Sequence, residues 1–355
     1  MGIVIGIIYC NEINMCPYMQ KYIDSLEKNC VKYKVLLWNR TGERKQYPLH
    51  YIVYNRELDL YVPKWKKIPA FVGFSKFLYK ELLNQRFDRL IMLTTLPTVI
   101  SAPLLLAKYK KKYIYDFRDM SFEKCIPFRI LVDKLVKHSY FTSVSSPGYM
   151  TVIKGDTIIS HNFRYSDLDN GLNKMKPFKE KITLLHIGIT RGEEYNKRLA
   201  DIFGNDNRFE VKIIGTGNDT KPFVEYIKKF RNITVKGTYN NEEKKKYIQE
   251  CDMLLYYYPC SFNNNRALAN KYYDGMIFKK PLIGNKNTYS GKWIMKAGLG
   301  ISVDIDNNDV PNQIYKYMHS IRIDEYEKLV QKELDKVIKE DQKYVKAIDS
   351  FVRGN

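Results

Sequence analysis

Short apolar runs alternate with amphipathic stretches along the first half of the chain. The runs are rich in Ile, Val, Leu and Tyr, as buried strands are, and they lie at 3–9, 34–39, 50–55, 89–94, 112–117, 140–146 and 156–162. Between them the pattern predicts helices over about 17–29, 97–110 and 125–138. Strands that alternate with helices predict a parallel sheet with helices on both faces.

The stretch 164–180 interrupts this alternation, because it has few large apolar residues and carries Gly, Pro and charged residues. We interpret it as a linker that follows a first domain of residues 1–163. The alternation then restarts, with strands predicted at 182–188, 209–217, 233–239, 253–259, 281–285 and 300–304. The chain is therefore predicted to be α/β, with a second doubly wound domain over 181–330. A long charged helix is predicted over about 323–352, and its part beyond the second domain (331–355) is expected to cross back to the first.

Composition limits the class of protein. The chain has 355 residues, enough for two cores, and its 45% apolar and 28% charged residues are typical of a folded globular protein. No apolar run approaches the length of about 18 residues that a membrane span needs. The start MGIVIGIIYC predicts a buried strand and not a signal peptide, and the six cysteines form no metal-like cluster. We expect a cytoplasmic protein without a cofactor or metal.

The formal net charge of +20 favours anionic partners, which include nucleic acid, anionic lipid and phosphate-bearing substrates. The same excess of lysine is expected from an AT-rich genome. The stretch 62–87 interleaves aromatic residues with lysines (Trp65, Phe71, Phe74 and Phe77 with Lys64, Lys66, Lys67, Lys76 and Lys80). This pattern suits an anionic membrane surface, and a packed amphipathic helix is the alternative. Binding of single-stranded nucleic acid is not expected, because no recognised motif accompanies the pattern.

Ligands of open parallel sheets bind beyond the carboxyl ends of the strands, so residues that follow strands are candidates. In the second half, Gly188 and the IIGTG segment with Gly215 and Gly217 allow the backbone to approach a ligand closely. Arg191 and Lys197 follow the first of these strands and could clamp a diphosphate, or they could be ordinary surface cations.

The segment PCSFNNNRAL predicts a helix start that can hold phosphate, because its asparagines supply cap oxygens and free N–H groups point outward there. We predict that a pyrophosphate meets Asn264, Asn265 and Arg266. A base or a sugar could lie against Gly237 to Tyr239, at the end of the predicted strand 233–239, or these residues could be an ordinary strand end.

The segment ANKYYDGMIFKKPLIGN (269–285) reads as the second half of that helix followed by a buried strand. The helix puts Asn270, Lys271 and Asp274 on one side. Asp274 is either a surface carboxylate paired with Lys271 or a ligand of a ribose diol, as acidic residues are in dinucleotide sites. We favour the ribose role.

Candidates in the first half also follow predicted strands. Asn11 and Glu12 follow the first strand and are expected to face a cleft between the domains. The DFRD segment supplies Asp116, Arg118 and Asp119, which could activate a hydroxyl or form a structural ion pair. His161 closes the last strand before the linker, where a hinge histidine bonded to its surroundings is the alternative to a site residue. His186, inside an apolar strand, is expected in the core.

The order of these segments resembles the nucleotide-sugar glycosyltransferases of the GT-B fold, and in particular the retaining family-4-like enzymes of bacterial capsule and O-antigen assembly. The segments that carry the resemblance are Gly188 with Arg191, IIGTG, VKGTYNNEEKKKYIQECDMLLYYYP, NKYYDGMIFKKPLIGN, YIYDFRD, SVSSPGYM and His161–Asn162. The family helix reads P-x-K-L-x-E-Y-M-x-x-G-K-P-V-I, and this chain matches it at Lys271, Tyr272, Met276, Lys280, Pro281 and Ile283.

The resemblance implies a nucleotide-diphospho-sugar donor, with UDP favoured, bound by the second domain. It also implies a saccharide acceptor, which can be linked to polyprenyl diphosphate, on the first domain near Asn11, Glu12, Asp116 and His161. In such retaining enzymes the donor phosphate acts as the base. Arg118 and Asp119 would then position the acceptor, and Arg191 and Lys197, or Lys271, would neutralise the leaving diphosphate.

Two positions depart from the family. Asp274 replaces the usual Glu, and Arg266 stands where the family has an acid that contacts the donor sugar. Two alternatives within the fold remain open, a sugar-nucleotide 2-epimerase and a non-catalytic sugar-nucleotide- or polysaccharide-binding subunit. The expected location is the cytoplasm, including the inner face of the plasma membrane.

Overall fold

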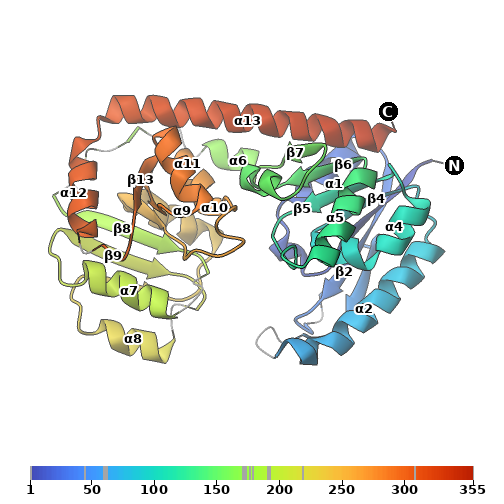
Figure 1. Cartoon of the computed structure of the whole chain (residues 1–355), viewed down its shortest axis with the longest axis horizontal. Helices are drawn as coiled ribbons and strands as arrows, with labels where there is room; N and C mark the ends of the chain where they lie inside the picture. The colour runs from blue at the N-terminus through green and yellow to red at the C-terminus, as the bar shows by residue number, and fades with distance from the viewer. Residues whose placement is uncertain are drawn as a thin grey trace. The chain divides into compact units, whose positions relative to one another are not determined.

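The computed structural model describes residues 2–43, 45–58, 63–169, 174–175, 177, 180–189, 193–217, 220–307 and 309–354. The chain divides into two compact units. Unit 1 comprises Met1–His161 and Lys339–Asn355, and unit 2 comprises Asn162–Ile338. Each unit is built around one parallel sheet with helices on both faces (Figure 1).

The sheet of unit 1 has seven strands in the order β3-β2-β1-β4-β5-β6-β7. They are β1 (Val4–Tyr9), β2 (Lys32–Asn39), β3 (Tyr51–Asn55), β4 (Arg89–Leu93), β5 (Tyr113–Phe117), β6 (Phe141–Val144) and β7 (Thr157–Ile159). All adjacent strands are parallel. The strand order reverses between β1 and β4, so the carboxyl ends of these two strands mark the switch point of this sheet.

The helices of unit 1 are α1 (Met19–Lys28), α2 (Lys64–Asn84), α3 (Thr95–Ile100), α4 (Ala102–Lys108) and α5 (Ile126–His138), with the short 3₁₀ helices η1 (Ile13–Met15) and η2 (Pro147–Thr151). The single helix predicted over 97–110 is wrong, because α3 ends and α4 begins around Ser101. Pro103 explains the break. It lies in the first turn of α4 and has no N–H to continue the bonding of α3.

The final helix, α13 (Ile323–Arg353), contributes to both cores, with the residues from Lys339 onward belonging to unit 1. There Tyr344, Ile348 and Phe351 are buried against α1 and the sheet. Its return to unit 1 agrees with the predicted crossing of the C-terminal helix to the first domain.

The sheet of unit 2 has six strands in the order β10-β9-β8-β11-β12-β13, again all parallel. They are β8 (Ile182–Ile187), β9 (Phe209–Ile214), β10 (Ile233–Lys236), β11 (Met253–Tyr256), β12 (Leu282–Asn285) and β13 (Gly300–Val303). The helices are α6 (Tyr165–Leu168), α7 (Glu193–Phe203), α8 (Lys221–Ile227), α9 (Asn241–Glu250), α10 (Asn270–Ile277), α11 (Tyr289–Ala297) and α12 (Val310–Ser320). The predicted fold class of two doubly wound parallel sheets is confirmed.

Two apolar clusters cover the faces of this second sheet. One is built with α7, α8 and α12, and the other with α9, α10, α11 and the first part of α13. The predicted linker 164–180 contains the short helix α6. Within the described ranges, no helix is long and apolar enough to cross a membrane.

Candidate functional site

Glycines shape the carboxyl ends of β8 and β9 in unit 2. Gly215 has φ +133°, and a Cβ there would lie 2.0 Å from the carbonyl oxygen of Gly188. Gly188 has φ +121°, and a Cβ there would meet no atom of the described residues within 4 Å, so the described part of the chain leaves open space beside the end of β8. Gly217 also adopts a positive φ, of +86°. Since the strand order reverses between β8 and β11, the open space lies at the switch point, where ligands of such sheets bind.

The helix after β11 begins later than the sequence suggests. The predicted helix start at 264–267 is wrong, because α10 begins at Asn270 after Ala269, whose backbone is extended (φ −89°, ψ 169°). Arg266 lies in the loop before it, where Nη1 donates to the carbonyl of Phe262 at 2.9 Å and the guanidinium stacks 4.4 Å from the Phe262 ring.

The asparagines of this loop bond within the loop. Asn264 Nδ2 donates to the carbonyl of Pro259 at 2.9 Å, and Asn265 Oδ1 accepts from the backbone N–H of Ser261 at 3.2 Å. Short polar side chains that satisfy the neighbouring backbone favour turns over helix, which explains the delayed start of α10. The predicted phosphate cradle at a helix start is therefore absent from 264–266, which form turns in the structure.

Lys271, in the first turn of α10, points into the protein. Its side chain is buried, with the residue 4% exposed, and Nζ lies 3.2 Å from His186 Nδ1 on β8 and 3.2 Å from the carbonyl oxygen of Leu255 on β11. The ring of Tyr258, just after β11, lies 4.9 Å from the same amine. No carboxylate of the described residues lies within ion-pair distance of Nζ.

Burial controls the protonation of this pair. It lowers the pKa of Lys271 to about 7, an effect that Lys244 reinforces and Asp274 opposes. Burial and the neighbouring lysine also lower the pKa of His186 well below its usual value, so the imidazole is neutral at physiological pH. Nδ1 of a neutral imidazole can accept the hydrogen bond from Lys271, which leaves the proton on Nε2.

Asp274 does not pair with Lys271. Its Oδ1 accepts from Lys244 Nζ of α9 at 2.8 Å, and both side chains are largely buried. Burial raises the pKa of Asp274, and the Lys244 ammonium opposes that shift. Tyr239 packs nearby, and its pKa is raised by burial with opposing contributions from Lys244 and Asp274. The structure thus brings Tyr239, Lys271 and Asp274 together with Lys244, which the sequence did not single out.

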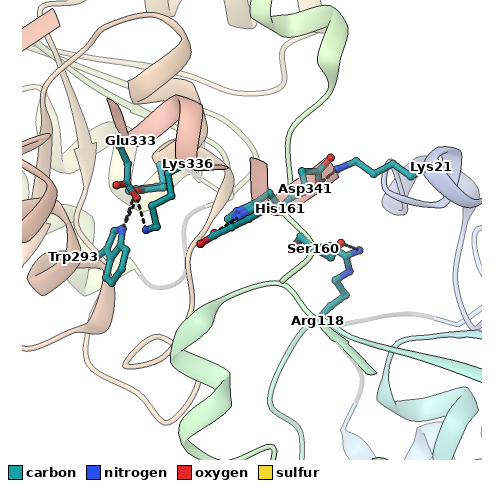
Figure 2. A network of polar contacts seen from close by, with 10 residues as sticks. Lys21, Arg118, Ser160, His161, Trp293, Glu333, Lys336 and Asp341 are labelled. Atoms are coloured by element: carbon teal, nitrogen blue, oxygen red, sulfur yellow. Dashed lines mark hydrogen bonds and ion pairs between the residues drawn. The ribbon is translucent and has the colours of Figure 1, made fainter. Parts of the chain in front are cut away.

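Tyr272, which follows Lys271 on α10, holds this helix against the rest of unit 2. Tyr272 is buried, and its hydroxyl donates to Glu333 Oε1 on α13 at 2.8 Å. Figure 2 shows the same carboxylate bonded to Trp293 Nε1 and to Lys336 Nζ, both at 3.1 Å. These bonds orient the helix that carries Lys271 and Asp274.

Of the two cations expected to clamp a diphosphate, the structure describes Lys197 alone. Lys197 is on α7, where its amine lies 5.2 Å from the ring centre of Tyr226 on α8. Arg191 lies outside the described residues.

In unit 1, the DFRD segment forms a buried ion pair at the end of β5. Arg118 Nε lies 2.6 Å from Asp116 Oδ1 and Nη2 lies 2.8 Å from Oδ2, in two-point contact. Nη2 also donates to Ser160 Oγ at 2.7 Å (Figure 2). The hydroxyl of Tyr22 donates to Asp116 Oδ2 at 2.9 Å. This is the structural ion pair that stood as the alternative to an acid–base role. Asp119 follows it and is exposed.

Glu12 organises the loops after β1 and β2. Its Oε1 accepts from the backbone N–H of Arg40 at 2.8 Å, and its Oε2 accepts from Lys45 Nζ at 3.1 Å. Asn11 Oδ1 in turn accepts from the backbone N–H of Glu12 at 2.9 Å. Both residues therefore anchor the loop at the carboxyl end of β1.

His161 joins the two sequence segments of unit 1. Its Nε2 lies 2.9 Å from Glu340 Oε2, and its carbonyl accepts from Lys21 Nζ at 2.9 Å. Lys21 also pairs with Asp341 at 2.6 Å, as Figure 2 shows. These contacts are those of a buried histidine bonded to its surroundings, at the end of the first segment.

The basic–aromatic stretch is only partly exposed. Phe74 is buried and stacks on Trp38 with ring centres 5.0 Å apart, as the alternative of a packed amphipathic helix predicts for this position. The large apolar residues described as exposed on α2 are Trp65 (67%), Ile68 (57%), Val72 (48%) and Leu83 (56%). Trp38 on β2 packs against Phe71 and Phe74, so the side of α2 that carries these rings faces the sheet.

The sequence did not single out two functional candidates, His186 and Lys244. His186 lies in an apolar strand, and no local signal separates a core histidine from one that holds a buried amine. Lys244 belongs to a run of three lysines, and within the described part of the chain it is the one of the three that pairs with a carboxylate, that of Asp274. Among the described residues, no group of His, Cys, Asp and Glu side chains is arranged to hold a metal ion.

Several proteins of known structure share this fold along their whole length. A glycosyltransferase from Rickettsia africae aligns with TM-score 0.64 and 11% identity, over 100% of both chains. Sucrose-phosphate synthase from Thermosynechococcus elongatus aligns with TM-score 0.64 and 11% identity, over 99% of this chain and 97% of that one. HepE from Anabaena, in complex with UDP and glucose, aligns with TM-score 0.58 and 10% identity, over 99% and 100%. No protein-family model and no curated protein matches the sequence.

These neighbours are GT-B glycosyltransferases, and the chain has the GT-B fold. At such identities the likeness concerns the fold.

Proposed function

We propose that this protein is a glycosyltransferase that uses a nucleotide-diphospho-sugar, with UDP as the favoured nucleotide. It transfers the sugar with retention to a hydroxyl of a lipid-linked or growing saccharide in cell-surface polysaccharide synthesis. The observation that carries the proposal is the buried Lys271 amine, which has no carboxylate partner among the described residues and lies beside Asp274 at the switch point of unit 2. HepE, which shares the fold, is known with UDP and glucose, which supports the donor class.

The proposed donor site divides the work between two side chains. Lys271 neutralises the diphosphate, whose negative charge grows as the sugar leaves, and this electrostatic effect is often the largest one in group transfer. Asp274 uses Oδ2, which makes no hydrogen bond within the described part of the chain, to accept from ribose hydroxyls. Gly188 lets the ligand approach the end of β8. Arg191 stays a predicted second partner of the diphosphate.

The first test is nucleotide binding. Calorimetry with UDP, GDP, ADP and CDP is expected to show binding of UDP by the wild-type chain. Asp274→Asn should weaken it about 10-fold to 100-fold, since a hydrogen bond to a charged group contributes about 1.5–3 kcal/mol. Glu250→Gln is the matched control, because Glu250 is an exposed acid at the end of α9 and should bind normally. Absence of binding to every nucleotide, or equal affinity of Asp274→Asn, contradicts the assignment.

The second test separates transfer from its rivals. A transferase releases UDP from a UDP-sugar only when a saccharide acceptor is present, whereas a 2-epimerase releases UDP from the donor alone. A binding subunit retains the donor and releases nothing in either case. Arg266 favours this last alternative, because it stands where the resembling family has an acid that contacts the sugar, and its guanidinium is engaged with Phe262.

We also propose that α2 contacts an anionic membrane, on which a lipid-linked acceptor would lie. Exposed Trp65, Ile68 and Val72 recur at helical spacing, and exposed Lys76 and Lys80 extend the same face. Apolar side chains with lysines beside them suit phosphatidylglycerol.

Vesicle co-sedimentation tests this surface. The wild-type chain should bind phosphatidylglycerol vesicles and not pure phosphatidylcholine vesicles, and Trp65→Ser with Ile68→Ser should lose most of that binding. Leu329→Ser is the control, because Leu329 is an exposed apolar residue on α13. Equal binding of the double variant and the control would refute the role of α2.

A further inference from the structure

The Lys271 amine is a buried base with neutral hydrogen-bond partners. Its two polar contacts are His186 Nδ1 and the carbonyl of Leu255, each at 3.2 Å. A buried ammonium without a nearby anion is unfavourable, because burial removes its hydration and neither contact carries a negative charge. The amine is therefore held where it loses a proton easily.

The charged groups around the amine do not change this conclusion. Asp274 on α10 is the acid that raises the pKa of Lys271. It is already paired with Lys244 of α9 at 2.8 Å, so the Asp274–Lys244 pair carries no net charge. Asp167 of α6 raises the pKa of Asp274 and is not among the groups that shift the pKa of the amine. From the β11 side the amine faces the neutral ring of Tyr258. No described residue supplies an uncompensated negative charge at the amine, which leaves that place to an anionic ligand.

His186 fixes the geometry of the amine. It is buried on β8, and its second ring nitrogen, Nε2, has no hydrogen-bond partner among the described residues. Nδ1 thus has the amine as its partner, and the imidazole holds Nζ beside the end of the strand. A leucine of similar size would leave the amine without this acceptor.

We propose that binding of the donor's diphosphate draws one proton from water onto the Lys271 amine, and that His186 is the positioning residue that holds the amine for this proton uptake. The proposal rests on the proposed function, since the anion is taken to be the donor's diphosphate. The step is an acid–base equilibrium in which the amine nitrogen forms an N–H bond with a proton of hydronium or of the buffer acid, whose own bond to that proton breaks and whose conjugate base stays in solution. The resulting ammonium pairs with the bound anion.

A pH dependence follows. Burial lowers the pKa of Lys271 to about 7, and a bound diphosphate raises it again. Below about pH 6 the amine is already protonated and binding takes up almost no proton. At pH 8 about 0.9 proton is taken up per bound ligand, and above pH 7 the affinity falls up to about tenfold per pH unit.

Calorimetry of UDP binding to the full chain tests the proposal. Titrations at pH 6, 7 and 8 in buffers of different ionisation enthalpy give the number of protons taken up. Lys271→Arg carries a permanent charge and should show no uptake attributable to this position. The terminal phosphate of UDP itself titrates near pH 6, at about the second pKa of a phosphate monoester, and the same contribution is present in the arginine variant, so the difference isolates Lys271.

His186→Leu should still bind UDP at pH 6 but move the midpoint of proton uptake to lower pH, because the ammonium loses an acceptor. A residue with only a packing role would leave that midpoint unchanged. Thermal unfolding of each variant checks that it is folded.

Inorganic pyrophosphate is titrated in parallel. UDP binding without proton uptake at pH 8, or uptake that persists in Lys271→Arg, overturns the proposal and leaves the proposed function standing. Pyrophosphate binding with uptake but no UDP binding keeps the proton-linked anion site and overturns the nucleotide-sugar function. No binding of either probe overturns both.

Discussion

Replacing Arg118 by Met tests whether the DFRD segment is structural. The guanidinium makes two contacts with Asp116, at 2.6 and 2.8 Å, and a third with Ser160 at 2.7 Å, and both members of the ion pair are buried. Arg118→Met leaves the Asp116 carboxylate buried, with the Tyr22 hydroxyl as its remaining donor.

Removing one partner of a buried ion pair costs about 3–5 kcal/mol, because the remaining charge stays without compensation. For a unit of this size, 1 kcal/mol changes the melting temperature by about 2–4 °C. The expected loss is therefore about 6–20 °C in the transition of unit 1, measured by differential scanning calorimetry. The double variant Asp116→Asn with Arg118→Met should be more stable than Arg118→Met alone, because it removes the uncompensated charge.

The control for this experiment is Arg129→Met, because Arg129 is an exposed arginine on α5 of the same unit and should change stability by less than about 0.5 kcal/mol. UDP binding, which is proposed for unit 2, should survive in Arg118→Met below its melting temperature. A variant that melts within 2 °C of the wild type while transfer is lost would refute the structural role and restore a catalytic one.

Three further predictions concern unit 2. Gly215→Ala should lower the free energy of unfolding, measured in urea, by about 1–3 kcal/mol. The reason is that the backbone of Gly215 has φ +133° and a Cβ would lie 2.0 Å from the Gly188 oxygen. An unchanged urea midpoint would contradict this. Asn240→Ala should lower the free energy of unfolding by about 1 kcal/mol in the same assay, because Asn240 caps α9 in a reciprocal arrangement with Glu243. A loss below about 0.3 kcal/mol would argue against the cap. Relative to Lys271→Met, the unliganded wild type should gain stability between about pH 7 and 10, by up to about 1.4 kcal/mol per pH unit. In that window the native Lys271 amine binds fewer protons than the unfolded one, and parallel stability curves of the two proteins would contradict it.

The apolar periodicity along the chain was enough to predict two doubly wound sheets, because strand and helix periods are local properties of the sequence. The cap of α9 is a local feature too. Asn240 and Glu243 lie three residues apart, and their bonds need no other part of the chain. The glycines after β8 and β9 were also recognisable as turn residues. The single helix predicted over 97–110 failed at Pro103, although that residue is a local signal too.

Only the tertiary structure decided how the candidate side chains are paired. The partner of Asp274 is Lys244, thirty residues away, and the partner of Lys271 is His186, 85 residues away. Arg118 is local to Asp116, yet its structural character depends on burial against Ser160 of a distant segment. The sequence by itself determined the elements and which residues follow the strands. Burial and long-range packing decided which charges are compensated, because desolvation depends on everything that surrounds a group and not on its neighbours in the chain.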